Sequence, residues 1–528
     1  MNRLWKLITR LYLRRYRVPR DLVRDAFDRY ADRTALVTPS GELSFNELAQ
    51  RVYSLSHALE QAGLRKGDRV FTLLHDDREQ VEARLAAFES GFVITSFHQS
   101  HSLEMIRKAA AIAGPEALIY DPGIHPELPD ALTEQQMNLF ALPVGTGGIY
   151  ESLLEQTQPC LSPFAIHPDD PALLGFTSGT TGEPKALFTT HGVIVSSLKL
   201  TAMNVSVKPG QRDRFLLGIP LVGAGSGVVM PMLFSGAAQV IPPAYTVEHL
   251  VRLISEHEIT RMFLTPSLLI DLLDHPEADL SSLRNVIYGT APMPVPKLEE
   301  AIRRWGPIFQ QGYGMAEVLP PVSLLQMHQH ARGEDPAPRS ILRTVGKVVP
   351  EVSVKVIDEF GSELPPGEVG EVLINSPTTF SGYWRDPELN ARVLRAGWYH
   401  SGDLGFVDRD GFLHILGRRH DIIKTDSGDV FPLTLEERAH DHPGVKEAAL
   451  IPALKGIELM LVVSPRREWR SPEKRALLEQ ELTALYARDP QNTKRPVQVA
   501  VLDELPRSYL VKVLRRDIRS AMQLSQHQ

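Results

Sequence analysis

Short apolar runs alternate with amphipathic stretches along most of the chain, and this alternation predicts strands separated by helices. Apolar runs typical of strands occupy residues 35–37, 69–74, 116–120, 213–219, 261–264 and 285–288. Two longer stretches, residues 45–61 and 78–90, place apolar side chains at helical spacing. Strands separated by helices of this length are typical of an α/β fold with largely parallel sheets.

The pattern changes in the last third of the chain. Residues 346–415 consist of short strand-like runs with turn sequences at 358–361 and 408–411, which predicts a β-rich subdomain. A charged segment with its own strand and helix pattern follows, long enough for a small domain. We therefore predict a large domain of α/β subdomains and a β-rich one over residues 21–417. A hinge and a small mobile α+β C-terminal domain would occupy residues 418–528.

The first twenty residues form a separate predicted unit, a basic amphipathic helix. Seven basic side chains precede the first acidic one, at positions 3, 6, 10, 14, 15, 17 and 20. Apolar residues recur between them at roughly helical spacing, so the helix could make peripheral contact with an anionic membrane. The alternative is an ordinary surface helix docked on the domain. The segment lacks the uncharged core of a secretory signal.

The amino-acid composition argues against some classes of function. The 528 residues include 57 basic and 64 acidic side chains, a formal charge of −7, which argues against a nucleic-acid partner. Cys160 is the single cysteine and can form no internal disulfide, so we expect a cytoplasmic protein, membrane-associated if the N-terminal helix binds lipid. Residues 215–247 carry no charge, but five glycines and four prolines interrupt them. This predicts a buried strand, turn and helix rather than a membrane span.

A loop rich in hydroxyl groups follows the apolar residues 172–174. Residues 176–185 read FTSGTTGEPK, and their hydroxyls, glycines and closing Lys185 suit a polyphosphate. The spacing is not that of a Walker A loop. Taken by its composition alone, the segment is more typical of a surface loop.

Five motifs, in this order, resemble those of the adenylate-forming superfamily, which includes the acyl-CoA synthetases and related AMP-dependent ligases. They are the phosphate loop at 177–185, GTAP at 289–292, GYGMAE at 312–317, WYHSGD at 398–403 with Gly417 and Arg418, and LPRSYLVK at 505–512. The resemblance extends over nearly the whole chain, from about residue 43 to residue 519.

The resemblance implies roles for individual residues. Asp403 would accept hydrogen bonds from the ribose hydroxyls, and Glu317 would hold Mg²⁺, a cation that prefers oxygen ligands. Lys512, with Lys185 and Glu317, would be catalytic, and Lys512 would offset charge at the α-phosphate. The residues implied in ATP or AMP binding are Thr177, Ser178, Gly179, Thr180, Thr181, Gly182, Lys185, Gly289, Thr290, Ala291, Pro292, Tyr313, Gly314, Met315, Ala316, Asp403 and Arg418.

The implied reaction activates a carboxylic acid with ATP to acyl-AMP, releases pyrophosphate and then forms a thioester. The implied cofactors are ATP, Mg²⁺ and coenzyme A. One alternative acceptor is the phosphopantetheine of an acyl carrier protein. Another alternative is a non-catalytic member that only binds nucleotide or acyl ligands.

Three departures from the family pattern bear on these alternatives. Ala316 stands where the family has a threonine, so one hydroxyl donor is missing. Residues 425–429 read TDSGD near the expected pantetheine path, which weighs against free coenzyme A. The hinge position carries His420, whose charge would respond to pH.

The expected acyl pocket is apolar. Its predicted walls are Val222, Gly223, Ala224, Met315 and Val318, and residues 219–227 hold no carboxylate that could pair with a substrate ammonium. We therefore expect a small-molecule acid with a hydrocarbon or aryl tail. Histidine pairs at 98/101, 328/330 and 440/442 lack the accompanying ligands of a zinc site and are interpreted as loop residues.

Overall fold

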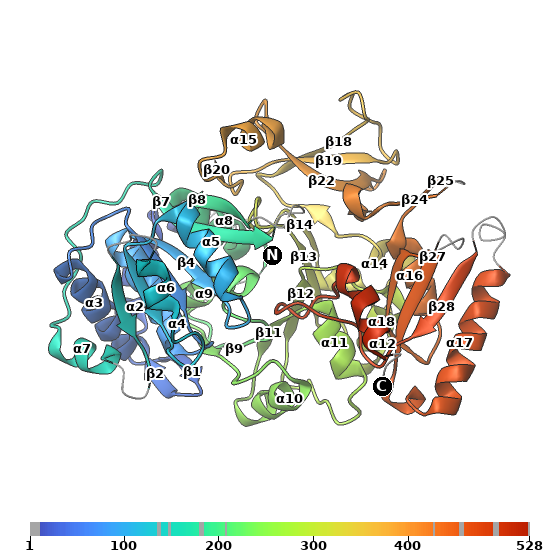
Figure 1. The fold of residues 1–528 in the computed structure, drawn as a ribbon, viewed down its shortest axis with the longest axis horizontal. Helices are drawn as coiled ribbons and strands as arrows, with labels where there is room; N and C mark the ends of the chain where they lie inside the picture. The colour runs from blue at the N-terminus through green and yellow to red at the C-terminus, as the bar shows by residue number, and fades with distance from the viewer. Residues whose placement is uncertain are drawn as a thin grey trace.

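A computed structural model describes residues 11–134, 139–145, 149–178, 184–205, 208–425, 428–453, 459–488 and 496–525 of the chain. Two large sheets with helices around them form the greater part of the molecule (Figure 1). The fold is mixed α/β, as the alternation of apolar and amphipathic stretches predicts. Among the described residues, no helix is long and apolar enough to cross a membrane.

Nine strands of the described chain form the larger sheet, and its central strands are parallel. In spatial order they are β17 (Lys347–Val348), β14 (Ser323–Leu325), β13 (Phe309–Tyr313), β12 (Asn285–Gly289), β11 (Arg261–Leu264), β9 (Arg214–Leu217), β10 (Ala238–Val240), β1 (Thr34–Thr38) and β2 (Gly41–Ser44). The carboxyl ends of parallel strands meet at one edge, which is where open α/β sheets bind ligands.

A second sheet has seven strands within the described ranges, parallel except at β8 and β20. In order they are β20 (Gly382–Tyr383), β8 (Pro184–Thr190), β7 (Pro171–Ser178), β4 (Val93–Phe97), β3 (Arg69–Leu73), β5 (Ala117–Tyr120) and β6 (Phe140–Pro143). One continuous apolar core contains buried residues from both sheets and from the helices between them.

Two of the helices begin and end where the sequence predicts. Helix α3 (Phe45–Gln61) starts at a capping box, in which Ser44 Oγ accepts from the Glu47 amide at 3.1 Å and Glu47 accepts from the Ser44 amide at 2.7 Å. Helix α4 (Arg78–Ser90) begins after the cap Asp77 and ends at Gly91, whose φ of 73° suits glycine. The other helices of this region are α2 (Pro19–Arg29), α5 (Leu103–Ala113), α6 (Leu128–Thr133), α7 (Tyr150–Gln156), α8 (His191–Asn204), α9 (Ser226–Ser235), α10 (Val247–Glu256), α11 (Pro266–Leu273) and α12 (Val295–Trp305).

The β-rich part and the C-terminal domain each have their own sheet. The β-rich sheet contains β18 (Ser353–Ile357), β19 (Gly370–Asn375), β21 (Leu394–Arg395), β22 (Trp398–Val407) and β23 (Leu413–Arg418), beside α15 (Pro387–Val393). The C-terminal sheet contains β26 (Val445–Pro452), β27 (Leu459–Pro465) and β28 (Val497–Val501), with α16 (Pro432–Ala439), α17 (Pro472–Ala487) and α18 (Ile518–Ser525). It lies at the opposite end of the molecule from α2 and α3 (Figure 1). Short elements complete the chain: α13 (Met327–His330), α14 (Arg339–Leu342), and the hairpins β15 (Ala331–Arg332) with β16 (Asp335–Pro336) and β24 (Ile423–Thr425) with β25 (Gly428–Val430).

The predicted helix over residues 1–20 differs from the structure in the part that is described. Residues 1–10 lie outside the described residues; residues 11–13 are helical, and α2 begins only at Pro19. The break has a steric cause, since a residue that precedes proline avoids helical backbone angles, and Val18 is extended. Leu13, Tyr16 and Val18 are buried, so residues 11–18 dock on the large domain.

Arg84, on α4, is a buried cation whose contacts within the described chain include no carboxylate. Its side chain retains 5% exposure, and within the described residues its one polar contact is Ser96 Oγ at 3.5 Å from Nη2. Burial lowers the pKa of this guanidinium to about 10. One turn earlier, both amide atoms of Gln80 are buried without a hydrogen-bond partner in the described structure. The buried guanidinium of Arg84 and the buried amide of Gln80 therefore lower the free energy of unfolding.

We predict that Arg84→Met stabilises the fold by about 1–2 kcal/mol, because methionine removes a desolvated charge and keeps an apolar side chain of similar length. The midpoint of thermal unfolding should rise. Arg24→Met is the matched control, since Arg24 pairs with the fully buried Glu89. Loss of the Arg24 guanidinium should destabilise the protein by about 3 kcal/mol, because the Glu89 carboxylate would stay buried without its partner. A lower midpoint for Arg84→Met would show that an unseen partner satisfies this cation.

Candidate active site

The carboxyl edge of β12 and β13 brings two predicted motifs together. Gly289 and Gly312 pair across these strands, and a Cβ at Gly289 would lie 2.6 Å from the Gly312 carbonyl oxygen, so only glycine fits. The next residue, Thr290, has φ 73°, a left-handed conformation unusual for threonine. Its buried hydroxyl has no hydrogen-bond partner in the described structure. A strained residue with an unpaired hydroxyl is typical of a ligand site.

Asp403, Arg418 and Tyr313 form a compact group above this edge. Asp403 is 3% exposed on β22, and its Oδ1 lies 2.8 Å from Arg418 Nε on the neighbouring strand β23. The Tyr313 hydroxyl, at the end of β13, donates to Oδ2 at 2.5 Å. Burial raises the pKa of Asp403, although Arg418 and Tyr313 oppose the rise. Three strands from two sheets therefore hold one carboxylate in place.

Glu317 and Lys185 come together through Tyr383. The Tyr383 hydroxyl donates to Glu317 Oε1 at 3.1 Å, and Lys185 Nζ lies 5.9 Å from the centre of the same ring. Lys185 is on β8, opposite Thr177 of β7. Of the predicted phosphate loop, Gly179, Thr180, Thr181 and Gly182 lie outside the described residues, and Thr177 and Ser178 are described only as the end of β7. The two described ends of the loop therefore pair with each other, and Lys185 lies near the ring of the tyrosine that bonds Glu317.

The residues present fit a magnesium ion that is shared with a nucleotide. Among the described residues, no group of three or more His, Cys, Asp or Glu side chains could hold a metal alone. Magnesium in nucleotide sites needs only one or two carboxylates, because phosphate and water oxygens complete its shell. Glu317, with one oxygen bonded to Tyr383, is placed to supply such a ligand.

Lys512 reaches the site from the C-terminal domain. Its side chain is mostly buried, and burial together with nearby Arg418 lowers the pKa of its amino group to about 8. The preceding residue, Val511, has φ 55° and packs against the apolar cluster of α11 and α12. A β-branched residue rarely adopts this conformation, so the backbone beside Lys512 is strained.

The predicted acyl pocket lies along a turn that leads into α9. Val222 is 6% exposed, Gly223 and Ala224 belong to a short 3₁₀ turn over Gly223–Gly225, and Val318 is fully buried. The Met315 amide donates to the Val318 carbonyl at 3.0 Å, which closes a turn between these two predicted wall residues. Ala316 between them is exposed, and methyl is the only group that it can offer.

The sequence reasoning missed Asp76, which the fold brings to this turn. Asp76 follows β3, and its carboxylate accepts from the Leu221 amide at 2.9 Å and from the Tyr245 hydroxyl at 3.0 Å. Burial raises the pKa of Asp76 to about 6. Both oxygens thus already accept hydrogen bonds, so Asp76 anchors the turn. An apolar turn sequence gives no signal for a partner 145 positions away.

The remaining predicted positions follow Arg418 along the chain or belong to the histidine pairs. His420 belongs to the short turn Arg419–Asp421 and is exposed. In the β24–β25 hairpin Thr425 pairs with Gly428 and Asp429 pairs with Lys424, while residues 426 and 427 lie outside the described residues. The three histidine pairs show no metal cluster in the described ranges.

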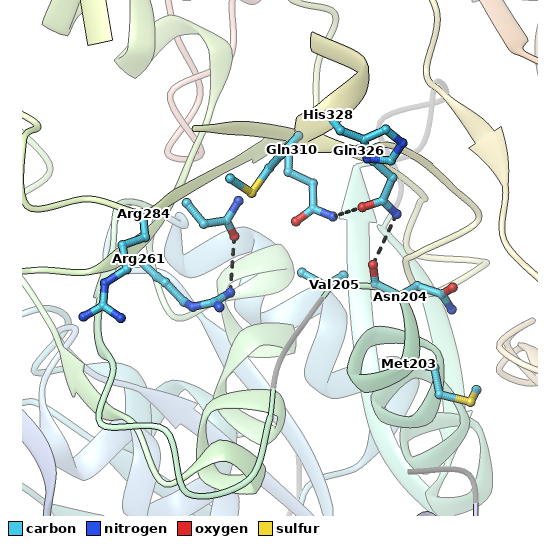
Figure 2. A pocket seen from close by; sticks show the side chains of 10 residues that line it. Met203, Asn204, Val205, Arg261, Arg284, Gln310, Gln326 and His328 are labelled. Atoms are coloured by element: carbon cyan, nitrogen blue, oxygen red, sulfur yellow. Dashed lines mark hydrogen bonds between the residues drawn. The ribbon is translucent and has the colours of Figure 1, made fainter. Parts of the chain in front are cut away.

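A separate cavity of about 530 Å³ lies at the other end of the same strands. Arg261, Asn285 and Gln310, near the amino ends of β11, β12 and β13, contribute to its lining (Figure 2). Gln310 donates to Gln326 at 2.8 Å, and Gln326 donates to the Asn204 carbonyl at 3.2 Å. This cavity is therefore distinct from the predicted nucleotide site at the carboxyl ends.

Known proteins resemble the chain along nearly its whole length. Residues 23–384 match the family described as AMP-binding enzyme. A medium/long-chain-fatty-acid–CoA ligase, FadD8 of Mycobacterium tuberculosis, is 31% identical, covering 94% of this chain and 89% of the relative. A feruloyl-CoA synthase of an Amycolatopsis species is 30% identical, covering 90% and 93%. The structure of the amide bond synthetase McbA of Marinactinospora thermotolerans superposes with a TM-score of 0.82 at 28% identity, covering 95% and 99%.

The chain belongs to the AMP-binding enzyme family, within the adenylate-forming superfamily. It is an AMP-forming acid–thiol ligase of the acyl-CoA synthetase type. Family membership and fold thus confirm the resemblance of the five motifs. The roles of individual residues stay predictions.

We predict that Tyr313→Phe lowers stability by about 1.5–3 kcal/mol, because it removes a hydrogen bond to a buried carboxylate. Tyr288→Phe is the matched control, since Tyr288 bonds His330 Nε2 at 2.9 Å, and burial lowers the pKa of that imidazole to about 4, so the acceptor is neutral. Tyr288→Phe should lower the free energy of unfolding by about half as much as Tyr313→Phe. Thermal unfolding of both variants measures the difference, and equal losses would contradict a charged Asp403.

Proposed function

We propose that this enzyme activates a carboxylic acid with a fatty or aryl tail and transfers the acyl group to coenzyme A. The observation that carries the proposal is the convergence of Asp403, Arg418 and Lys512 at the carboxyl edge of β12 and β13. The proposal extends the family assignment to a substrate class and to named residues.

In the first half-reaction, the substrate carboxylate attacks the α-phosphorus of ATP, and pyrophosphate leaves. Asp403 accepts hydrogen bonds from the ribose, while Arg418 keeps the carboxylate ionised and oriented. Lys512 offsets the charge that develops on the α-phosphate, and Lys185 with the phosphate loop holds the outer phosphates. Glu317 would hold a magnesium ion, which would supply positive charge to offset that of the phosphates.

The acid binds against the turn of Val222, Gly223 and Ala224, opposite Met315 and Val318. These walls are apolar, and residues 219–227 carry no carboxylate that could pair with a substrate ammonium. Fatty and aryl tails both suit such a pocket. Exchange of labelled pyrophosphate into ATP, over a panel of fatty, aryl and amino acids, tests this proposal: turnover restricted to amino acids would refute it.

The second half-reaction requires the C-terminal domain to turn, with His420 at the hinge, so that a thiol reaches the acyl carbonyl. Coenzyme A is the proposed acceptor, and a carrier-protein phosphopantetheine is the alternative that Thr425 and Asp429 keep open. Purified acyl-AMP offered with either acceptor separates the two. Thioester formed only with the carrier protein would overturn the coenzyme A assignment.

We predict that Lys512→Ala lowers the rate of acyl-AMP formation by about 100- to 1000-fold, because a preorganised charge at the α-phosphate is lost. ATP affinity should change little, since ribose and adenine contacts remain. Single-turnover formation of acyl-AMP and equilibrium ATP binding measure the two effects. Lys424→Ala, at an exposed lysine of the same domain, is the control. Unchanged adenylation would show that the lysine assignment is wrong.

The pH dependence of adenylation should follow Lys512. Its pKa of about 8 means that the amino group is charged below this pH and neutral above it. We therefore predict that kcat/KM for ATP is constant below pH 8 and falls above it, because this parameter reports the free enzyme. Lys512→Arg should abolish the fall, since arginine stays charged. If kcat/KM falls equally above pH 8 in the wild type and in Lys512→Arg, the titrating group is not Lys512.

A further inference from the structure

Tyr509, three residues before Lys512, connects the C-terminal domain to two loops of the large domain. Its ring stacks on His98 with centroids 4.9 Å apart and planes at 22°, and it meets His101 edge-on at 5.0 Å. On its other side, a Cβ at Gly223 would lie 3.6 Å from the Tyr509 hydroxyl oxygen. Tyr509 thus touches both the loop after β4 and the turn of the proposed acyl pocket.

Hydrogen bonds hold the loop of His98 and His101, and its two imidazole rings are neutral. The His98 amide donates to His101 Nδ1 at 2.8 Å, and the His101 amide donates to the His98 carbonyl at 2.9 Å. His125 bonds the His101 carbonyl at 3.0 Å, which ties the loop to the segment after β5. Burial lowers the pKa of both His98 and His101, so these rings stack as uncharged aromatics near neutral pH.

The backbone between Tyr509 and Lys512 forms a closed turn. Ser508 donates its amide to the Lys512 carbonyl at 2.8 Å, and its hydroxyl accepts from the Lys512 amide at 3.3 Å. The Val511 amide donates to the Ser508 carbonyl at 2.8 Å, in the left-handed conformation already described. Because the turn is closed, the place where Tyr509 docks fixes the place where Lys512 emerges.

We propose that Tyr509 is a positioning residue that, by stacking on His98 and His101, seats Lys512 for adenylation and covers the acyl pocket at Gly223. The inference rests on the proposed function. Rotation of the C-terminal domain for thioester formation would separate Tyr509 from the histidine loop. Tyr509 therefore acts in the first half-reaction and not in the second.

The test compares the two half-reactions in the full-length enzyme. Single-turnover acyl-AMP formation should fall roughly 3- to 10-fold in Tyr509→Ala and in His98→Ala, a factor that corresponds to one lost aromatic pair. Tyr509→Phe should restore the rate, because it keeps the ring. The double variant should be no slower than the slower single variant, since both remove one contact. Thioester formation from supplied acyl-AMP should not fall in any of them.

The matched control is Arg343→Ala. Arg343 pairs with Glu437 at 2.9 Å and thus connects the same two domains away from the lysine turn. Its adenylation rate should stay within about twofold, as expected for an exposed ion pair. The proposal is overturned if Arg343→Ala slows adenylation as much as Tyr509→Ala does. It is also overturned if the Tyr509→Ala variant slows thioester formation as much as adenylation. A double variant whose adenylation rate falls by the product of the two single effects would overturn it as well.

Failure of the proposed function gives a different result. In that case the wild-type enzyme forms no acyl-AMP from any acid, and the positioning role falls with it. If the wild type is active and Tyr509→Ala adenylates at the wild-type rate, the proposed function stands and the role of Tyr509 is refuted.

Discussion

The position of Lys512 depends on a buried ion network between the two domains. Arg507 reaches Asp271 of α11 at 2.6 Å and Glu447 of β26 at 2.6 Å, while Lys446 meets Asp271 at 2.7 Å. Ser267 completes the network by donating to Glu447 at 2.7 Å. Although burial would raise the pKa of Asp271, Arg507 and Lys446 hold it below its usual value. Each charge is paired, and a change of one partner would leave another buried without compensation.

This network suits an enzyme whose domains must separate. An interface built from ion pairs can exchange its partners for water when it opens, whereas a large apolar interface would resist opening. Arg507 lies two residues before Tyr509 and five before Lys512, so the same segment carries the anchor, the aromatic contact and the proposed catalytic charge. In the structure all three lie against the large domain, the arrangement that the proposed role of Lys512 in adenylation requires.

Local features of the sequence predict much of the fold. Helices α3 and α4 match the predicted ranges, and a capping residue, Ser44 or Asp77, marks the start of each. Long-range contacts could not be predicted: Asp76 anchors the acyl turn from another sheet, and Tyr509 meets His98 across more than 400 positions. The N-terminal helix was predicted too long, because its apolar periodicity outweighed the steric effect of Pro19.

The most direct test of adenylation traces an oxygen atom of the substrate carboxylate into the products. The acid that supports pyrophosphate exchange is labelled with ¹⁸O in its carboxylate, and the products with ATP and coenzyme A are analysed by mass spectrometry. Attack of the carboxylate on the α-phosphorus transfers one labelled oxygen to AMP, which is the result that the account predicts. Label in inorganic phosphate together with ADP would place the attack at the γ-phosphorus and contradict adenylation at this site.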